Sequence, residues 1–96
     1  MAKSRGAGSD IEVKIQTEES QKAVACRYGF LSMSRIFVRK SQFPLGTHVV
    51  VKIRNGHCGA TLPGVVSESY PDLGQIIQFT EKTNRAVREL GTLLAT

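Results

Sequence analysis

The sequence predicts a mainly β protein, a compact antiparallel β-barrel closed by one C-terminal amphipathic helix. Three observations lead to this fold class. Apolar and polar residues alternate with a period of two in several short segments, as in strands with one buried face. Proline- and glycine-containing turns separate these segments. Near the C-terminus the apolar period becomes that of a helix with one buried stripe.

The length and composition indicate one small globular domain. The chain has 96 residues, of which 41% are hydrophobic and 22% charged, enough for one modest core. No apolar stretch is long enough to span a bilayer, and residues 1–10 lack the apolar core of a secretory signal. We therefore expect a cytoplasmic protein in which residues 1–9 form a flexible basic arm and residues 10–96 form the domain.

The first half of the chain predicts three strands. Apolar residues alternate with polar ones from Ile11 to Ile15, which predicts the first strand. Residues 23–28 predict the second, and residues 29–34 a loop. The third strand covers residues 35–39 and has a basic outer face.

A turn at residues 44–46 leads into the strongest predicted strand, residues 47–54. Asn55 and Gly56 follow it directly. This pair indicates a tight hairpin, because both central positions of such a turn need a positive φ.

The partner strand of this hairpin covers residues 57–70. Pro63 and Gly64 interrupt it and predict a bulge or a barrel corner. A turn over residues 71–74 then leads to the last strand, residues 75–80. The chain therefore predicts six strands.

The C-terminal segment predicts one helix, with Thr83 as a candidate N-terminal cap. Its apolar stripe consists of Ala86, Val87, Leu90, Leu93 and Leu94. Such a stripe must bury against an apolar surface, so we expect the helix to close the open end of the barrel.

The sequence contains no motif of a common enzyme class, so we expect a non-catalytic protein without a cofactor. Cys26, His48, His57 and Cys58 are residue types that bind zinc, but the paired spacing of zinc sites is missing. We expect no metal site, and cysteines that are reduced and structural.

The net charge of +5 favours an anionic partner. The basic residues are scattered along the chain without an RNA-type aromatic motif, which makes nucleic acid an unlikely partner by sequence. A barrel that binds single-stranded nucleic acid would need exposed aromatic residues for base stacking. The candidates are Tyr28, Phe30, Phe37, Phe43 and Tyr70.

A series of segments from Gly29 onward has a recognisable order and spacing. The segments are FLSMSRIFV at 30–38, PLGT at 44–47, VVVKI at 49–53, LPGVV at 62–66 and LGQIIQFT at 73–80. This series resembles the PilZ domain of bacteria. In that family, similar segments form a six-stranded antiparallel barrel with a terminal helix, so the resemblance implies a PilZ-like fold here.

PilZ domains are known as receptors for the second messenger cyclic di-GMP. The family binds it with Arg-x-x-x-Arg in the N-terminal arm and Asp/Asn-x-Ser-x-x-Gly in the loop before the third strand. The resemblance places Arg5 and Ser9 in the first motif, and Phe30, Ser32 and Arg35 in the second. Only the first arginine and the serine match, so we expect direct binding of cyclic di-GMP to be weak or absent.

One branch of the family lacks both motifs and has Pro-Phe-Val-x-x-Gly-Gly-Ile-Phe-Val in this region. Phe30 and the segment 36–38 are similar to it, although Ser34 and Arg35 replace its two glycines. Members of this branch are adaptors connected to an EAL-domain protein and to the pilus assembly ATPase. The resemblance therefore implies an adaptor in cyclic di-GMP, type IV pilus or motility control. The candidate partner surface consists of Phe30, Phe37, Arg39 and Lys40.

Two questions remain open at the level of the sequence. Phe37 is either exposed beside the basic residues of its strand or part of the core, with those residues a solvated face. The domain is either an adaptor or a divergent cyclic di-GMP receptor. The substitute phosphate ligands of such a receptor would be Arg5 with Arg27, Arg35 or Arg39.

Overall fold

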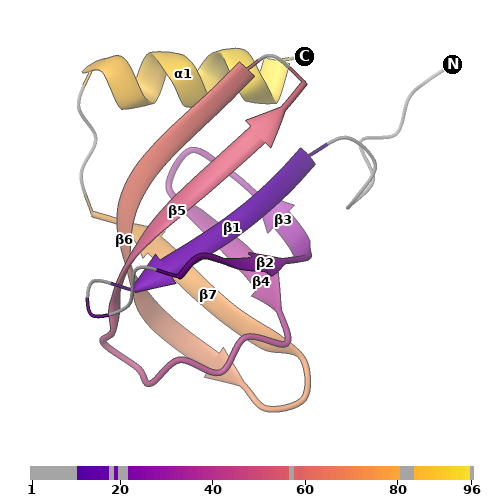
Figure 1. Cartoon of the computed structure of the whole chain (residues 1–96), viewed down its shortest axis with the longest axis vertical. Helices are drawn as coiled ribbons and strands as arrows, with labels where there is room; N and C mark the ends of the chain where they lie inside the picture. The colour runs from indigo at the N-terminus through magenta and orange to yellow at the C-terminus, as the bar shows by residue number, and fades with distance from the viewer. Residues whose placement is uncertain (1–10, 18, 20–21, 57, 81–83, 96) are drawn as a thin grey trace, which may run out of the picture.

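The computed structural model describes residues 11–17, 19, 22–56, 58–80 and 84–95. These residues form β1 (Ile11–Thr17), β2 (Val24–Cys26), β3 (Tyr28–Leu31), β4 (Arg35–Arg39), β5 (His48–Asn55), β6 (Cys58–Tyr70), β7 (Gly74–Phe79) and α1 (Asn84–Ala95). The arrangement is a curled antiparallel sheet with the helix across one end (Figure 1). The predicted combination of a β-barrel and a C-terminal helix is confirmed.

The strand order is β2-β1-β5-β6-β7-β4-β3, and every neighbouring pair is antiparallel. The two outermost strands, β2 and β3, follow each other directly in the chain and are joined by Arg27. The carbonyl oxygen of Arg27 accepts a hydrogen bond from the backbone N–H of Arg39 on β4 (2.7 Å). The sheet therefore curls into a nearly closed barrel whose seam lies at Arg27.

The predicted number of six strands is wrong, because the expected second strand is split in two at the seam. Before Arg27 the chain pairs with β1, where Val24 lies opposite Ile15. After Arg27 it pairs with β4, where Tyr28 lies opposite Val38. The expected loop over 29–34 is correspondingly shorter, since β3 continues to Leu31.

The long strand β6 bends where it passes from β5 to β7. Gly64 pairs with residues of both neighbours, and a Cβ atom on it would lie 2.9 Å from the carbonyl oxygen of Gln78. Glycine is needed at this close approach of β6 to β7. The register shift itself lies between Val66 and Glu68, so the expected bulge at Pro63 and Gly64 is placed too early.

The turns agree with the sequence except in one detail. Hydrogen bonds from the N–H of Thr47 to Pro44 O (3.1 Å) and from the N–H of Leu73 to Tyr70 O (2.9 Å) close the turns at 44–46 and 71–74. The β5–β6 hairpin also forms, but Asn55 ends β5 opposite Cys58. The tight turn is therefore one residue later than predicted, with Gly56 at a φ of +64°.

The core lies inside the barrel and continues up to the helix. Its buried side chains are Val13, Ile15, Tyr28, Ile36, Val38, Val49, Val51, Ile53, Ala60, Leu62, Val66, Ile77, Phe79, Ala86, Leu90 and Leu93. Every strand except β2 contributes to this set, and α1 contributes three residues. The inward positions follow the predicted alternation along β1, β4 and β5.

The helix α1 packs over the end of the barrel next to β6, as predicted (Figure 1). Its apolar stripe is narrower than expected, because Val87 and Leu94 are 41% and 37% exposed. The amide nitrogen of the Asn55 side chain donates to the carbonyl oxygen of Leu93 (3.4 Å) and ties the helix to β5. The candidate cap Thr83 lies outside the described residues. In the described ranges no helix is long and apolar enough to cross a membrane.

A buried polar side chain holds the segment that follows β4. Gln75 is 1% exposed, and its Oε1 accepts hydrogen bonds from Ser41 Oγ (2.8 Å) and Phe43 N (3.0 Å). Its Nε2 donates to Phe43 O (2.6 Å) and to Ser69 Oγ (3.2 Å). These bonds satisfy both ends of the amide and fix the course of residues 41–43 over β7.

Candidate functional site

The turn between β3 and β4 uses the hydroxyl group of Ser32 to hold its own shape. Ser32 Oγ accepts from the backbone N–H groups of Ser34 and Arg35, both at 3.3 Å. It also donates to the carbonyl oxygen of Arg35 at 3.2 Å. The side chain predicted to contact a nucleotide therefore lies in a turn in which it caps the backbone.

An aromatic pair lies directly beside this turn. Phe30 on β3 and Phe37 on β4 stack with their ring centroids 6.0 Å apart and an angle of 17° between the ring planes. The guanidinium carbon of Arg35 lies 5.8 Å from the centroid of Phe30, within the range of a cation–π contact. Phe30 is 42% exposed, so a large apolar side chain and a cation face solvent together.

Phe37 lies on the outer face of the barrel, and the alternative that it belongs to the core is wrong. Ile36 and Val38 on either side of it point inward and are fully buried. The ring of Phe37 instead covers two glycines. A Cβ atom would lie 2.6 Å from its Cδ2 at Gly29 and 2.9 Å from its Cζ at Gly74. The ring is half-buried because it fills the space left by these missing side chains.

The neighbouring strands extend this patch. Ile76 lies opposite Phe37 and is 9% exposed, and Tyr70 lies opposite Gly74 and is 42% exposed. The Tyr70 hydroxyl donates to the Glu68 carboxylate, which raises the pKa of Tyr70 through this bond and through its negative charge. The positive charge of Arg35 acts in the opposite direction. We call this patch the aromatic surface; it consists of Phe30, Arg35, Phe37, Tyr70 and Ile76.

The other two residues expected on the partner surface lie at the end of β4 and just beyond it. Because a strand rises about 3.3 Å per residue, the Cα atoms of Arg35 and Arg39 are roughly 13 Å apart along β4. Arg39 lies at the barrel seam beside Arg27, and the backbone N–H of Lys40 donates to Leu73 O (3.1 Å). The structure thus brings together Phe30 and Phe37 with Arg35. Arg39 follows Phe37 on the same face of β4 and lies opposite Gly74, whereas Lys40 lies beyond the end of the strand.

The predicted nucleotide site is described only in part. Arg5 and Ser9 lie outside the described residues. Ser32 and Arg35 lie in the same turn, where Ser32 bonds to the backbone and Arg35 faces Phe30. Among the aromatic residues considered for base stacking, Tyr28 is buried and Phe43 packs against the core. The other three belong to the aromatic surface.

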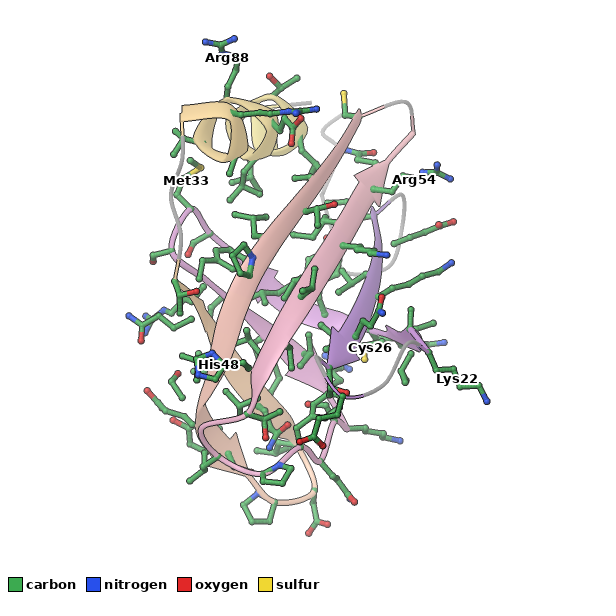
Figure 2. All side chains as sticks on the ribbon, turned by 60° about the vertical axis from the view of Figure 1, so that its left-hand side comes forward. Lys22, Cys26, Met33, His48, Arg54 and Arg88 are labelled. Atoms are coloured by element: carbon green, nitrogen blue, oxygen red, sulfur yellow. The ribbon has the colours of Figure 1, made fainter. Side chains whose placement is uncertain are left out.

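The cysteines are free and half-buried against the core. Burial raises the pKa of the Cys26 thiol, which disfavours its thiolate form. In the part of the chain that the structure describes, no three potential metal ligands gather, and His48 is exposed on the outside of β5 (Figure 2). His57 lies outside the described residues.

The sequence did not predict that basic residues would gather on the outer face of β1 and β5. Lys14 on β1 lies directly opposite Lys52 on β5, with Arg54 two residues further along β5. All three side chains are exposed, and Arg54 points away from the barrel (Figure 2). The alternation along each strand places these basic residues on the outer face. They form a cluster only when the two strands pair in this register.

No protein-family model matches the chain, and no curated protein matches its sequence either. The resemblance to PilZ domains therefore rests on the order and spacing of the segments between Phe30 and Thr80 in the sequence.

Proposed function

We propose that this protein is a non-catalytic, cytoplasmic signalling domain of the PilZ type that acts as a protein-interaction adaptor. Its partner binds the aromatic surface. The observation that carries this proposal is the exposed stack of Phe30 on Phe37 with the Arg35 guanidinium beside it. Aromatic residues and arginine are the side chains that dominate the binding energy of protein interfaces.

The chemistry of the same residues disfavours a nucleotide ligand. Phe30 stands where the resemblance places an Asp or Asn, and a phenyl ring cannot hydrogen-bond a guanine edge. The hydroxyl group of Ser32 is engaged within its turn. The turn therefore offers apolar surface and one cation in place of polar groups that would recognise a base.

The shape of the patch also suits a protein partner. Phe37 is half-buried and Ile76 is buried, and together they form the apolar centre of the surface. Phe30 and Tyr70 are exposed beside them. Charged groups, Arg35 and Glu68, lie at its border. An apolar centre with a polar rim is the usual anatomy of a specific interface. The partners that the resemblance implies are an EAL-domain protein and the pilus assembly ATPase.

The proposal predicts that Phe30→Ala weakens binding of the purified full-length chain to its EAL-domain or ATPase partner by about tenfold or more. The reason is the loss of the exposed half of the aromatic stack. Isothermal titration calorimetry with each purified partner measures this effect. Arg35→Ala is expected to act in the same direction.

Leu45→Ala is the matched control, because Leu45 is 63% exposed in a turn away from the aromatic surface. It removes a similar apolar side chain and is expected to leave binding unchanged. Equal affinities of the Phe30→Ala and wild-type chains, with the fold intact by circular dichroism, would contradict the assignment of this surface. Binding of neither partner by the wild-type chain would contradict the adaptor function.

A further inference from the structure

A second surface lies on the outside of β1, β5 and β6, beside α1. Lys14 and Lys52 form a directly opposed pair on neighbouring strands, an arrangement that like charges destabilise. Glu12 lies opposite Arg54, yet no described carboxylate lies within ion-pair distance of Lys14, Lys52 or Arg54. These three cations therefore lie together on one face, none of them in a direct ion pair.

The surface is hollowed where the helix meets the sheet. A cavity of about 660 Å³ lies between α1 and the three strands, with Gly59 and Thr61 of β6 forming part of its floor. Gly59 leaves the space open, since a Cβ atom there would meet only one backbone oxygen, at 3.6 Å. From the helix, Arg85 and Glu89 line the cavity and pair with each other at 3.2 Å.

This cavity continues around the barrel through two further hollows. The first, of about 700 Å³, shares Glu12 and Lys14 with it and reaches Arg27 and Arg39 at the seam. The second, of about 800 Å³, shares these two arginines and ends at Lys40. We call this continuous surface the basic band; its cations are Lys14, Arg27, Arg39, Lys40, Lys52, Arg54 and Arg85. Among the residues lining the three hollows, only Glu12 and Glu89 carry a negative charge.

We propose that the basic band binds the sugar–phosphate backbone of nucleic acid without reading its bases. Guanidinium and ammonium groups form strong charge-assisted hydrogen bonds to phosphate oxygens. A band of seven cations in connected hollows suits a ligand with regularly repeated negative charges better than a single small anion. The overall charge of +5 attracts such a ligand from a distance.

The composition of the basic band favours nucleic acid over a protein as its ligand. Two aromatic residues line the hollows. Tyr28 is buried in the core, and Phe43 packs against the core. Val24 is the one large apolar side chain exposed along them. A protein interface needs an apolar centre, whereas interfaces with nucleic acid are more polar and more positive. The lack of a stacking aromatic also predicts contacts to phosphates rather than to bases.

The test is the binding of the full chain to a fluorescent DNA duplex of about 20 base pairs, measured by anisotropy between about 50 and 200 mM salt. We expect binding without sequence preference and a steep loss of affinity with salt. In Lys14→Gln/Lys52→Gln the affinity is expected to fall about tenfold or more, and the slope of log affinity against log salt by about 1.8. Glu12→Gln is expected to tighten binding.

The matched control is Lys22→Gln/Arg88→Gln, which makes the same change in net charge outside the band. Both side chains are exposed and point away from the barrel (Figure 2). Three results would overturn the proposal: no binding at low salt, an equal loss in the control, or equally effective displacement of the duplex by polyglutamate. Because the tested lysines lie on β1 and β5, away from Phe30 and Phe37, none of these results bears on the adaptor function.

Discussion

Replacement of Gly74 by alanine is expected to lower the free energy of unfolding by about 4 kcal/mol. Gly74 has a φ of +151°, a conformation that residues with a side chain rarely adopt. An added Cβ atom would overlap the carbonyl oxygen of Val38 and lie 2.9 Å from the Cα atom of Arg39. Both atoms belong to the backbone of β4, which cannot rotate away. Urea unfolding followed by circular dichroism measures the loss.

Gly46→Ala separates the two causes of this effect. Gly46 also has a positive φ, +84°, but a Cβ atom there would meet no atom within 4 Å. Its replacement is expected to lower the free energy of unfolding by only about 1 kcal/mol, the contribution of backbone strain alone. A similar loss for both variants would contradict the close approach of β7 to β4 at Gly74. It would also contradict the packing of the Phe37 ring over Gly74.

Leu90→Ala is expected to lower the free energy of unfolding by about 3 kcal/mol. Leu90 is fully buried and is the central contact between α1 and the core. Its truncation leaves a cavity at the end of the barrel and loosens the helix that forms one wall of the basic band. Chemical denaturation measures the loss of stability, and hydrogen exchange of the α1 amides shows whether the helix loosens.

Val87→Ala is the control on the same helix. Val87 is 41% exposed, so its replacement is expected to change the free energy of unfolding by less than about 1 kcal/mol. Equal effects of the two substitutions would contradict the packing of α1 through Ala86, Leu90 and Leu93. The predicted stripe included Val87 with Leu90, and this comparison measures how much narrower the buried stripe is.

The fold was predictable wherever one local pattern coincided with one structural element. The alternation in β1, β4 and β5, the turns and the amphipathic helix are local features, and the structure contains all of them. The split at Arg27 was not predictable, because the alternation continues through it while the pairing partner changes from β1 to β4. Pro63 and Gly64 indicated a disturbance of the strand, but the register shift depends on β7 and lies beyond Val66.

The candidate surfaces were predictable to different degrees. Phe30 and Phe37 were both expected on a partner surface, and strand pairing brings them into a stack. Lys40 was expected with them because it is close in sequence, yet it lies beyond the end of β4 beside β7. The basic band could not be predicted, since its cations come from β1, β5, α1 and the seam. Residues that looked scattered along the chain are neighbours only in the folded barrel.

The central claim is that the β3–β4 turn serves a protein partner and does not bind a nucleotide. The most direct test is a titration of the isotope-labelled, nucleotide-free chain with cyclic di-GMP, followed by amide NMR shifts. The account predicts that the amides of residues 30–37 do not move, even at millimolar ligand. Joint shifts of these amides and of those of residues 1–9 at micromolar ligand would contradict it, and would identify the protein as a divergent cyclic di-GMP receptor.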